Sequence, residues 1–316
     1  MKEILANESL NKWSDEDLQE AANKNLGEDP ARLAQDLATI KAWIAKSPHL
    51  HSIRQDDGFL IMFLRGCKFS LERTKEKLDF HFTVRGNLPS WFDGWDPRFP
   101  EIKHIIKAGI YIPLPGYDRH GRKVIVMRGG LSDPDTMKKD DEFKTSTMVM
   151  EAAMNGDKQA VICGIVLIQD LNNMTLAHAI SPAVAKKAMT VWQDAYPTRP
   201  KALHFVNMPP VMERMFNMVQ GFQKEKMRER NHVHPKGDYS KMQADLGLEV
   251  LPKEYGGTNT SLDELRDYWI DEIDNRREWL LEQPKFKTDE KKRPGKPKSH
   301  SDIFGIEGSF RKLEID

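Results

Sequence analysis

The sequence predicts an α/β protein preceded by a small, all-helical unit. In residues 1–92 apolar side chains recur at helical spacing, whereas after the turn-rich stretch 91–100 short apolar runs alternate with helical patterns. At 316 residues the chain can form about two folding units. We therefore expect a helical domain over residues 1–92, an α/β domain over 93–260, and a C-terminal helix with a basic, flexible tail over 261–316.

The helices of the first unit are predicted from their start and stop signals. Asp29 and Pro30 open one helix, because Asp is a good N-cap and Pro fits the first helical turn. A second helix begins near Asp57. Ser70 caps a third, which ends before Pro89.

The α/β part is predicted from short apolar runs separated by longer helical patterns. The segment 118–121 reads as a hairpin turn between two of these runs. Strands are expected over 110–114, 124–127, 161–168 and 203–206, and helices over 142–154, from residue 182 onward and over 208–230.

Composition narrows the possible function classes. Lys plus Arg and Asp plus Glu both number 48, so the zero net charge gives no sign of a nucleic-acid partner. The N-terminus lacks the apolar segment of a secretory signal, and the longest apolar run is too short to cross a bilayer. Two cysteines far apart in sequence do not indicate a disulfide framework. These features favour a cytoplasmic protein.

Motifs for covalent chemistry are missing. The sequence contains no GxSxG, P-loop, GxGxxG or HExxH pattern, and no nucleophile can be paired with a base. Asp170 ends an apolar strand as a magnesium ligand of a phosphatase or NTPase would, but no phosphate-binding loop accompanies it. His232 and His234 share a spacing that some metal ligands use, without a nearby carboxylate or thiol. We predict no catalytic residue, no metal and no cofactor.

Residues 208–230 form the most informative segment. Val211, Met215, Val219 and Phe222 make an apolar stripe that further Met and Phe residues widen beyond an ordinary buried face. Flexible methionines suit a lid that packs against protein in one state and lipid in another, with Gly221 as a candidate hinge. A methionine-rich core helix explains the stripe equally well.

Basic residues follow this stripe directly. Lys224, Lys226, Arg228 and Arg230 alternate with acidic residues, so the pattern is compatible with a membrane-facing surface or with a salt-bridged, solvated one.

Five motifs resemble the Sec14-like CRAL-TRIO family in order and spacing. They are FLRGCKFSLERTKEKL (63–78), IQDL (168–171), SPAVAKK (181–187), YPTRPKALHFVNMP (196–209) and LPKEYGG (251–257). Within the family, the chain is most similar to the branch of α-tocopherol transfer protein and cellular retinaldehyde-binding protein. The resemblance implies a mixed sheet with helices that form a lidded hydrophobic pocket.

The same resemblance implies two sets of site residues. The lipid pocket would be lined by Met148, Ile168, Val191, Leu203, Val211, Met212, Phe216, Val219 and Phe222. A phosphoinositide head group would be bound by Arg199, Lys201, Lys226 and Arg230. One basic residue of the family's head-group site falls on Cys67 here, next to Lys68.

We therefore expect a cytoplasmic carrier of one small hydrophobic ligand, such as a tocopherol, a retinoid or another isoprenoid, that associates transiently with phosphoinositide-containing membranes. The alternative is a lipid-sensing adaptor that presents its C-terminal tail, ending in SFRKLEID, to a protein partner. A third interpretation of the sequence is a phosphatase or NTPase that uses Asp170.

Overall fold

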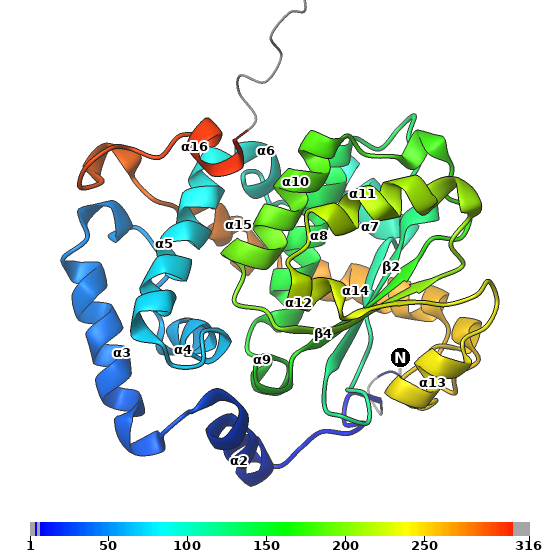
Figure 1. The fold of residues 1–316 in the computed structure, drawn as a ribbon, viewed down its shortest axis with the longest axis horizontal. Helices are drawn as coiled ribbons and strands as arrows, with labels where there is room; N and C mark the ends of the chain where they lie inside the picture. The colour runs from blue at the N-terminus through cyan, green and yellow to red at the C-terminus, as the bar shows by residue number, and fades with distance from the viewer. Residues whose placement is uncertain (1–3, 5–6, 306–316) are drawn as a thin grey trace, which may run out of the picture.

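The N-terminal unit is a layer of helices beside the rest of the molecule (Figure 1). The computed structural model describes residue 4 and residues 7–305. The helices of this unit are α2 (Asp15–Leu26), α3 (Pro30–Ala45), α4 (Asp57–Gly66) and α5 (Leu71–Asn87). Ile40, Phe63, Leu64 and Phe82 form its core and are at most 1% exposed. As predicted, Asp29 caps α3 by accepting a hydrogen bond from the backbone N–H of Ala31.

A five-stranded mixed sheet forms the centre of the second unit, in the order β1-β2-β3-β4-β5. The strands are β1 (Tyr111–Pro113), β2 (Lys123–Arg128), β3 (Ile165–Asp170), β4 (Pro200–Val206) and β5 (Asn231–Val233). β1 and β2 form the predicted antiparallel hairpin, and the remaining neighbours are parallel. The prediction of an α/β fold behind a helical unit is confirmed.

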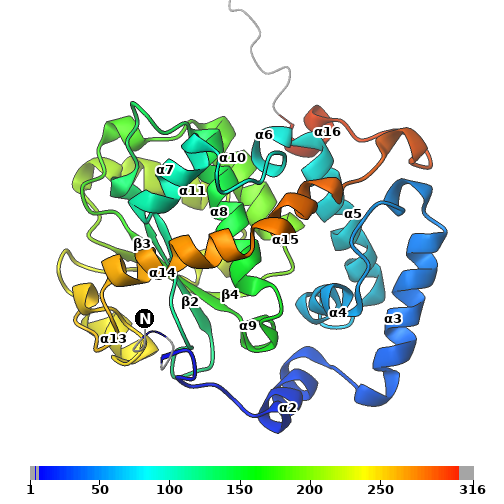
Figure 2. The same ribbon diagram turned by 180° about the vertical axis from the view of Figure 1, so that it is seen from behind.

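Helices cover both faces of the sheet. One face carries α10 (Pro182–Thr190), α11 (Glu213–Gly221) and α12 (Glu225–Arg228), in front in Figure 1. The other carries α7 (Pro100–Ala108) and α14 (Leu262–Asn275), in front in Figure 2. The remaining helices are α6 (Pro89–Phe92), α8 (Lys139–Met154), α9 (Lys158–Cys163), α13 (Ser240–Leu246), α15 (Arg277–Glu282) and α16 (His300–Phe304).

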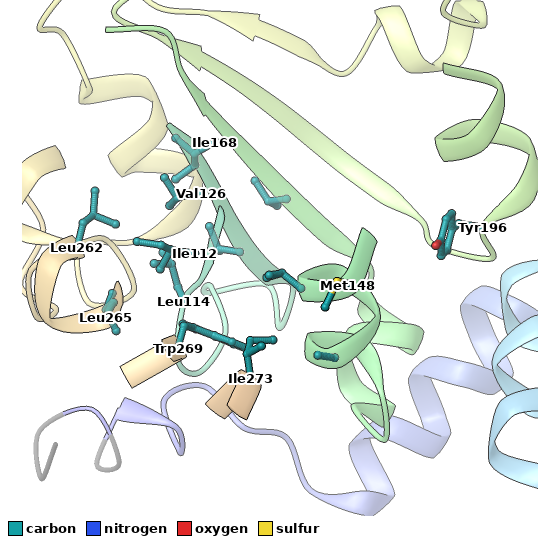
Figure 3. Close-up of a cluster of buried hydrophobic side chains, with 14 of the residues drawn as sticks. Ile112, Leu114, Val126, Met148, Ile168, Tyr196, Leu262, Leu265, Trp269 and Ile273 are labelled. Carbon is teal, nitrogen blue, oxygen red and sulfur yellow. The ribbon is translucent and has the colours of Figure 1, made fainter. Parts of the chain in front are cut away.

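The largest hydrophobic cluster packs the sheet against α14. Figure 3 shows Val126 and Ile168 from the strands facing Leu262, Leu265 and Trp269 of that helix. The indole N–H of Trp269 donates to the carbonyl oxygen of Pro113 at 2.7 Å, so its polar edge is satisfied inside the core.

The predicted strand over 161–168 is shorter than expected. Its first residues belong to α9, because Asp157 caps that helix by accepting from the N–H of Ala160. Gly164, with a φ of 95°, then turns the chain into β3.

The predicted helix over 208–230 is not continuous. A single 3₁₀ turn (Pro210–Met212) leads into α11, which ends at Gly221. Lys224 has extended backbone dihedrals, φ −63° and ψ 148°, and separates α11 from the short α12. The basic residues therefore do not continue the helix that carries the apolar stripe. We call residues 208–230 the lid segment.

The C-terminal segment differs from the expected flexible tail. Residues 285–305 pack against the N-terminal unit, where Asp79 of α5 accepts hydrogen bonds from Arg293 and Lys298, each at 2.7 Å. His49 contacts the same carboxylate at 3.1 Å. Phe304 in α16 is completely buried. The basic run has charged partners that sequence composition does not reveal. The final motif, SFRKLEID, lies outside the described residues.

Replacing Asp79 with Asn should lower the free energy of unfolding by about 2–3 kcal/mol, since several half-buried cations lose their counter-ion. Urea denaturation at neutral pH measures this change. Asp274→Asn, which breaks an exposed ion pair with Arg98, is the control and should change stability little. Equal effects of the two substitutions would contradict the importance of Asp79.

The contribution of Asp79 should also depend on pH. Hydrogen bonds from Arg293 and Lys298 lower the pKa of the Asp79 carboxyl from 3.8 to about 2, against the opposing effect of burial. Its stabilisation is therefore complete above pH 3.8 and is lost as the pH falls through about 2. Denaturation curves of the parent and Asp79→Asn proteins should converge as the pH is lowered through this range.

Candidate functional site

One face of the sheet presents apolar side chains to the lid segment. Side chains alternate between faces along a strand, and residues in register on parallel neighbours share a face. Leu167 is in register with Leu203, and Gln169 with Phe205, so these four side chains point to the same side. The ring of Phe216 from α11 meets Phe205 edge-on, with centroids 4.8 Å apart. This side is therefore the lid face of the sheet.

Helix α11 covers this face loosely. It carries Met215, Phe216, Met218 and Val219, yet none of its residues is fully buried. An amphipathic helix of a globular protein normally buries its apolar stripe in the core. The incomplete burial of α11 leaves apolar surface on the helix and on the sheet beneath it.

The structure brings part of the predicted pocket together. Leu203 lies on the lid face, Phe216 contacts it through Phe205, and Met212 is fully buried in a cluster with Phe205 and Met215. Val219 and Phe222 are half-buried along the same lid segment.

Other predicted pocket residues lie elsewhere. Ile168 is in register with Val126 and His204, so strand alternation places it on the opposite face, against α14 (Figure 3). We correct its assignment to a core residue. Val211 is 42% exposed, whereas Met148 and Val191 are completely buried in the main core.

A cavity of about 410 Å³ lies between the two units. One wall comes from α4 and α5, with Phe59, Met62 and His81. The opposite wall comes from α8, α9 and the loop before β4, including Met154 and Tyr196. None of the predicted pocket residues lines it. Sequence patterns could not reveal this cavity because its residues come from segments far apart along the chain.

Four cations gather where β4 begins. The charges of Arg199, Arg230 and Lys68 each act on Lys201 and, after the larger effect of burial, lower the pKa of its ammonium to about 8. The Arg199 guanidinium donates to the carbonyl oxygen of Ile162 at 2.7 Å, and Arg230 donates to that of Pro200. We call these four residues the basic cluster.

Three of the four predicted head-group residues, Arg199, Lys201 and Arg230, lie in the cluster. The fourth, Lys226, has an exposed side chain on α12. Lys68 is the fourth member of the cluster. It lies in the turn that ends α4, where Lys68 and Phe69 have φ values of 52° and 56°.

Comparison with known proteins identifies the family. A family model described as "CRAL/TRIO domain" matches residues 107–257, and one described as "Pinta-like, UBA domain" matches residues 29–102. The Homo sapiens protein named "Alpha-tocopherol transfer protein-like" is 30% identical over 250 residues, which cover 78% of this chain and 72% of that protein. The chain belongs to the CRAL-TRIO family. The resemblance seen in the five sequence motifs is thereby confirmed.

Two further similarities accompany this membership. "Clavesin-2" from Homo sapiens is 29% identical over 240 residues, covering 75% of this chain and 73% of that protein. A solved structure titled "Crystal structure of Sfh5" matches with a TM-score of 0.44 and 16% identity over 82% of this chain and 98% of that one. CRAL-TRIO proteins form a lipid-binding and lipid-transfer family.

In this CRAL-TRIO protein the candidate reactive groups have structural partners. Asp170 accepts hydrogen bonds from Asn207 at 3.0 Å and from the Tyr255 hydroxyl at 2.9 Å, which tie together the loops at the end of β3. Burial raises the pKa of the Cys67 thiol and raises that of Cys163 to about 11, which disfavours the nucleophilic thiolate.

The histidine pair also has structural contacts. His234 is buried and lies 2.9 Å from His204, measured between ring nitrogens, while His232 stacks on the same ring. Within residue 4 and residues 7–305, no group of three or more His, Cys, Asp or Glu side chains is arranged to hold a metal ion. Nor does any helix of that part combine the length and apolar character needed to cross a membrane.

The different environments of Ile168 and Phe216 should appear as different stability effects. Ile168→Ala opens a cavity in a fully buried cluster and should cost ~2–5 kcal/mol of unfolding free energy. Phe216→Ala removes a half-buried side chain and should cost only ~1 kcal/mol. Chemical denaturation of both variants measures the difference. A larger loss for Phe216 would mean that α11 belongs to the rigid core.

Proposed function

We propose that the protein carries one small hydrophobic ligand between the lid segment and the sheet, and delivers it at phosphoinositide-containing membranes from the cytoplasm. The observation that carries this proposal is the absence of any fully buried side chain in α11, despite its four large apolar residues. A helix that gains burial when an apolar molecule enters beneath it is suited to a carrier. No covalent step is part of this function.

The energetics explain why a lid is needed. Each CH₂ group that leaves a bilayer for water costs ~0.8 kcal/mol, so a carrier must enclose nearly all of its ligand. Leu167, Leu203 and Phe205 supply an apolar floor, and Phe216 supplies part of the cover. Methionines in α11 add flexible contacts that adapt to an irregular ligand.

The lid face favours an isoprenoid-like ligand with few polar groups. Gln169 is the polar residue among the four in-register side chains, so it offers one amide beside a largely apolar floor. The names of the similar human proteins, one of them tocopherol transfer protein-like, support a tocopherol among the candidates. A retinoid or another isoprenoid fits the same chemistry.

The basic cluster supports docking on an anionic head group. The charges of Lys68, Arg199 and Arg230 repel that of Lys201 and, after the larger effect of burial, lower the pKa of its ammonium to about 8. A multiply charged phosphoinositide head group would relieve this repulsion. Each basic residue near an anionic leaflet contributes ~1 kcal/mol, enough for a transient contact but not for permanent anchoring.

Exposed apolar residues near the other end of β4 supply a second membrane contact. Met174 and Met212, from the loops after β3 and β4, pack in one cluster. The same loops expose Leu176 and Val211, which are 68% and 42% accessible. Because the basic cluster lies at the start of β4, contact at both ends would turn the lid face toward the bilayer.

A charge placed under the lid should weaken ligand retention. We expect Phe216→Asp to reduce the affinity for α-tocopherol or all-trans-retinal, whichever the parent protein takes up from vesicles, by at least about tenfold, equivalent to ~1.4 kcal/mol. Phe99→Asp is the matched control, since Phe99 is 42% exposed at a site away from the lid face. Unchanged retention in Phe216→Asp would overturn the proposed ligand position.

Membrane docking should weaken as the pH rises through about 8, because Lys201 then loses the charge that attracts the head group. Flotation with vesicles containing phosphatidylinositol bisphosphate, compared at pH 7 and 9, measures this loss. Lys201→Arg keeps its charge over this range and should remove the pH dependence. Lys226→Arg is the control and should retain it. Identical pH profiles for the parent and Lys201→Arg would contradict the role of Lys201.

A further inference from the structure

The cavity between the two units has aromatic and aliphatic walls. Phe59 and Met62 face it from α4, Met150 and Met154 from α8, and Trp279 from the segment after α14. Its volume of about 410 Å³ falls within the ~300–1,000 Å³ typical of small-molecule sites. These walls favour an apolar ligand with a compact, flat shape.

His81 provides a hydrogen-bonding group in this apolar setting. Its ring is only 4% exposed and lies edge-on to Phe63 and Tyr196, with centroids 5.3 and 5.2 Å away. Nδ1 lies 3.2 Å from the carbonyl oxygen of Ala195 and must donate its hydrogen there. Among the described residues, the hydrogen bond of the His81 ring runs through Nδ1 and none joins Nε2 to a protein group, and His81 lines the cavity.

The imidazole is neutral in this environment. Burial, reinforced by the positive charges of Arg85 and Lys77, holds the pKa of His81 well below its usual value. With the hydrogen on Nδ1, Nε2 is an acceptor and can receive a hydrogen bond from a ligand.

Charged groups around the cavity already have partners. Arg54 donates to Asp56 and Asn155, and its guanidinium also lies over the ring of Phe59. The Glu151 carboxylate accepts from Arg85 and from the Tyr196 hydroxyl, each at 2.6 Å. An apolar molecule can therefore enter the cavity without leaving a buried charge unpaired.

We propose that this cavity is a second ligand site, for a compact apolar alcohol or phenol whose hydroxyl donates to Nε2 of His81. Leu203, Phe205 and Phe216 of the lid face do not line it, although Met150 and Met154 in its wall share a hydrophobic cluster with Leu167 of that face. It also stands independently of the carrier function proposed above. A bound ligand would contact α4 and α5 on one side and α8 on the other, and would stabilise the contact between the two units.

The probes 1-hydroxypyrene and pyrene test this site, because they differ only by a hydroxyl group. Trp279 lines the cavity, and Trp192 stacks on Tyr196 in its wall, so energy transfer from tryptophan to pyrene reports binding. At pH 7 we expect 1-hydroxypyrene to bind about tenfold more tightly than pyrene, since only its hydroxyl pairs with His81. Equal affinities for the two probes would overturn the role of the histidine.

Three variants separate this site from the lid face. His81→Phe keeps an aromatic ring without the acceptor and should abolish the preference for 1-hydroxypyrene. Met154→Trp fills the cavity and should reduce binding of both probes, whereas Phe216→Asp at the lid face should leave both unchanged. If His81→Phe does not fold, the binding of both probes to Met154→Trp and the difference between the two probes on the parent protein still test the proposed site. Binding that is lost in Phe216→Asp and retained in Met154→Trp would overturn the proposal.

Discussion

The contact on which the two candidate sites depend is a half-buried ammonium group between the units. Nζ of Lys77, on α5, donates to the carbonyl oxygens of Gln193, Asp194 and Tyr196 at 3.3, 2.8 and 3.0 Å. The last carbonyls of a helix lack partners within it, so they are natural acceptors for a cation. Lys77 thereby fixes the chain just before β4. On one side of that point Tyr196 faces the cavity, and on the other Arg199 begins the basic cluster.

Close packing strengthens the same contact. Gly66 at the end of α4 lies against Pro197, where a Cβ atom would come within 2.4 Å of the proline carbonyl oxygen, so a larger residue would force the units apart. Arg85 adds charged contacts, because it donates to Glu151 of α8 and to the carbonyl oxygen of Gln283. The N-terminal unit is therefore part of the architecture of both sites. The position of Lys68 in the basic cluster follows from this docking.

Sequence information was sufficient where local chemistry decides structure. Asp29 and Ser70 marked the starts of α3 and α5, because helix-start preferences act over a few residues, although only the side chain of Asp29 makes the capping hydrogen bond. Sequence information failed for residues 161–168, because an apolar run is compatible with a buried strand or with a buried helix. The side chain of Asp157, which lies outside the run, selects the helix by capping it. The place of Lys68 in the basic cluster has a tertiary cause, because the docking of α4 brings it near Lys201, a residue more than 130 positions later in the chain.

The C-terminal segment shows how composition can mislead about function. Its basic run suggested a free tail for a protein partner, but Arg293 and Lys298 reach Asp79, more than 200 residues earlier in the chain. Arg293 also pairs with Glu290 within the segment, so much of the local charge is already neutralised. Removing residues 285–316 would thus disturb the N-terminal unit together with any partner contact. The adaptor hypothesis can be separated from folding only by a truncation that begins after Gly305, because the contacts of α16 with the rest of the protein are then preserved.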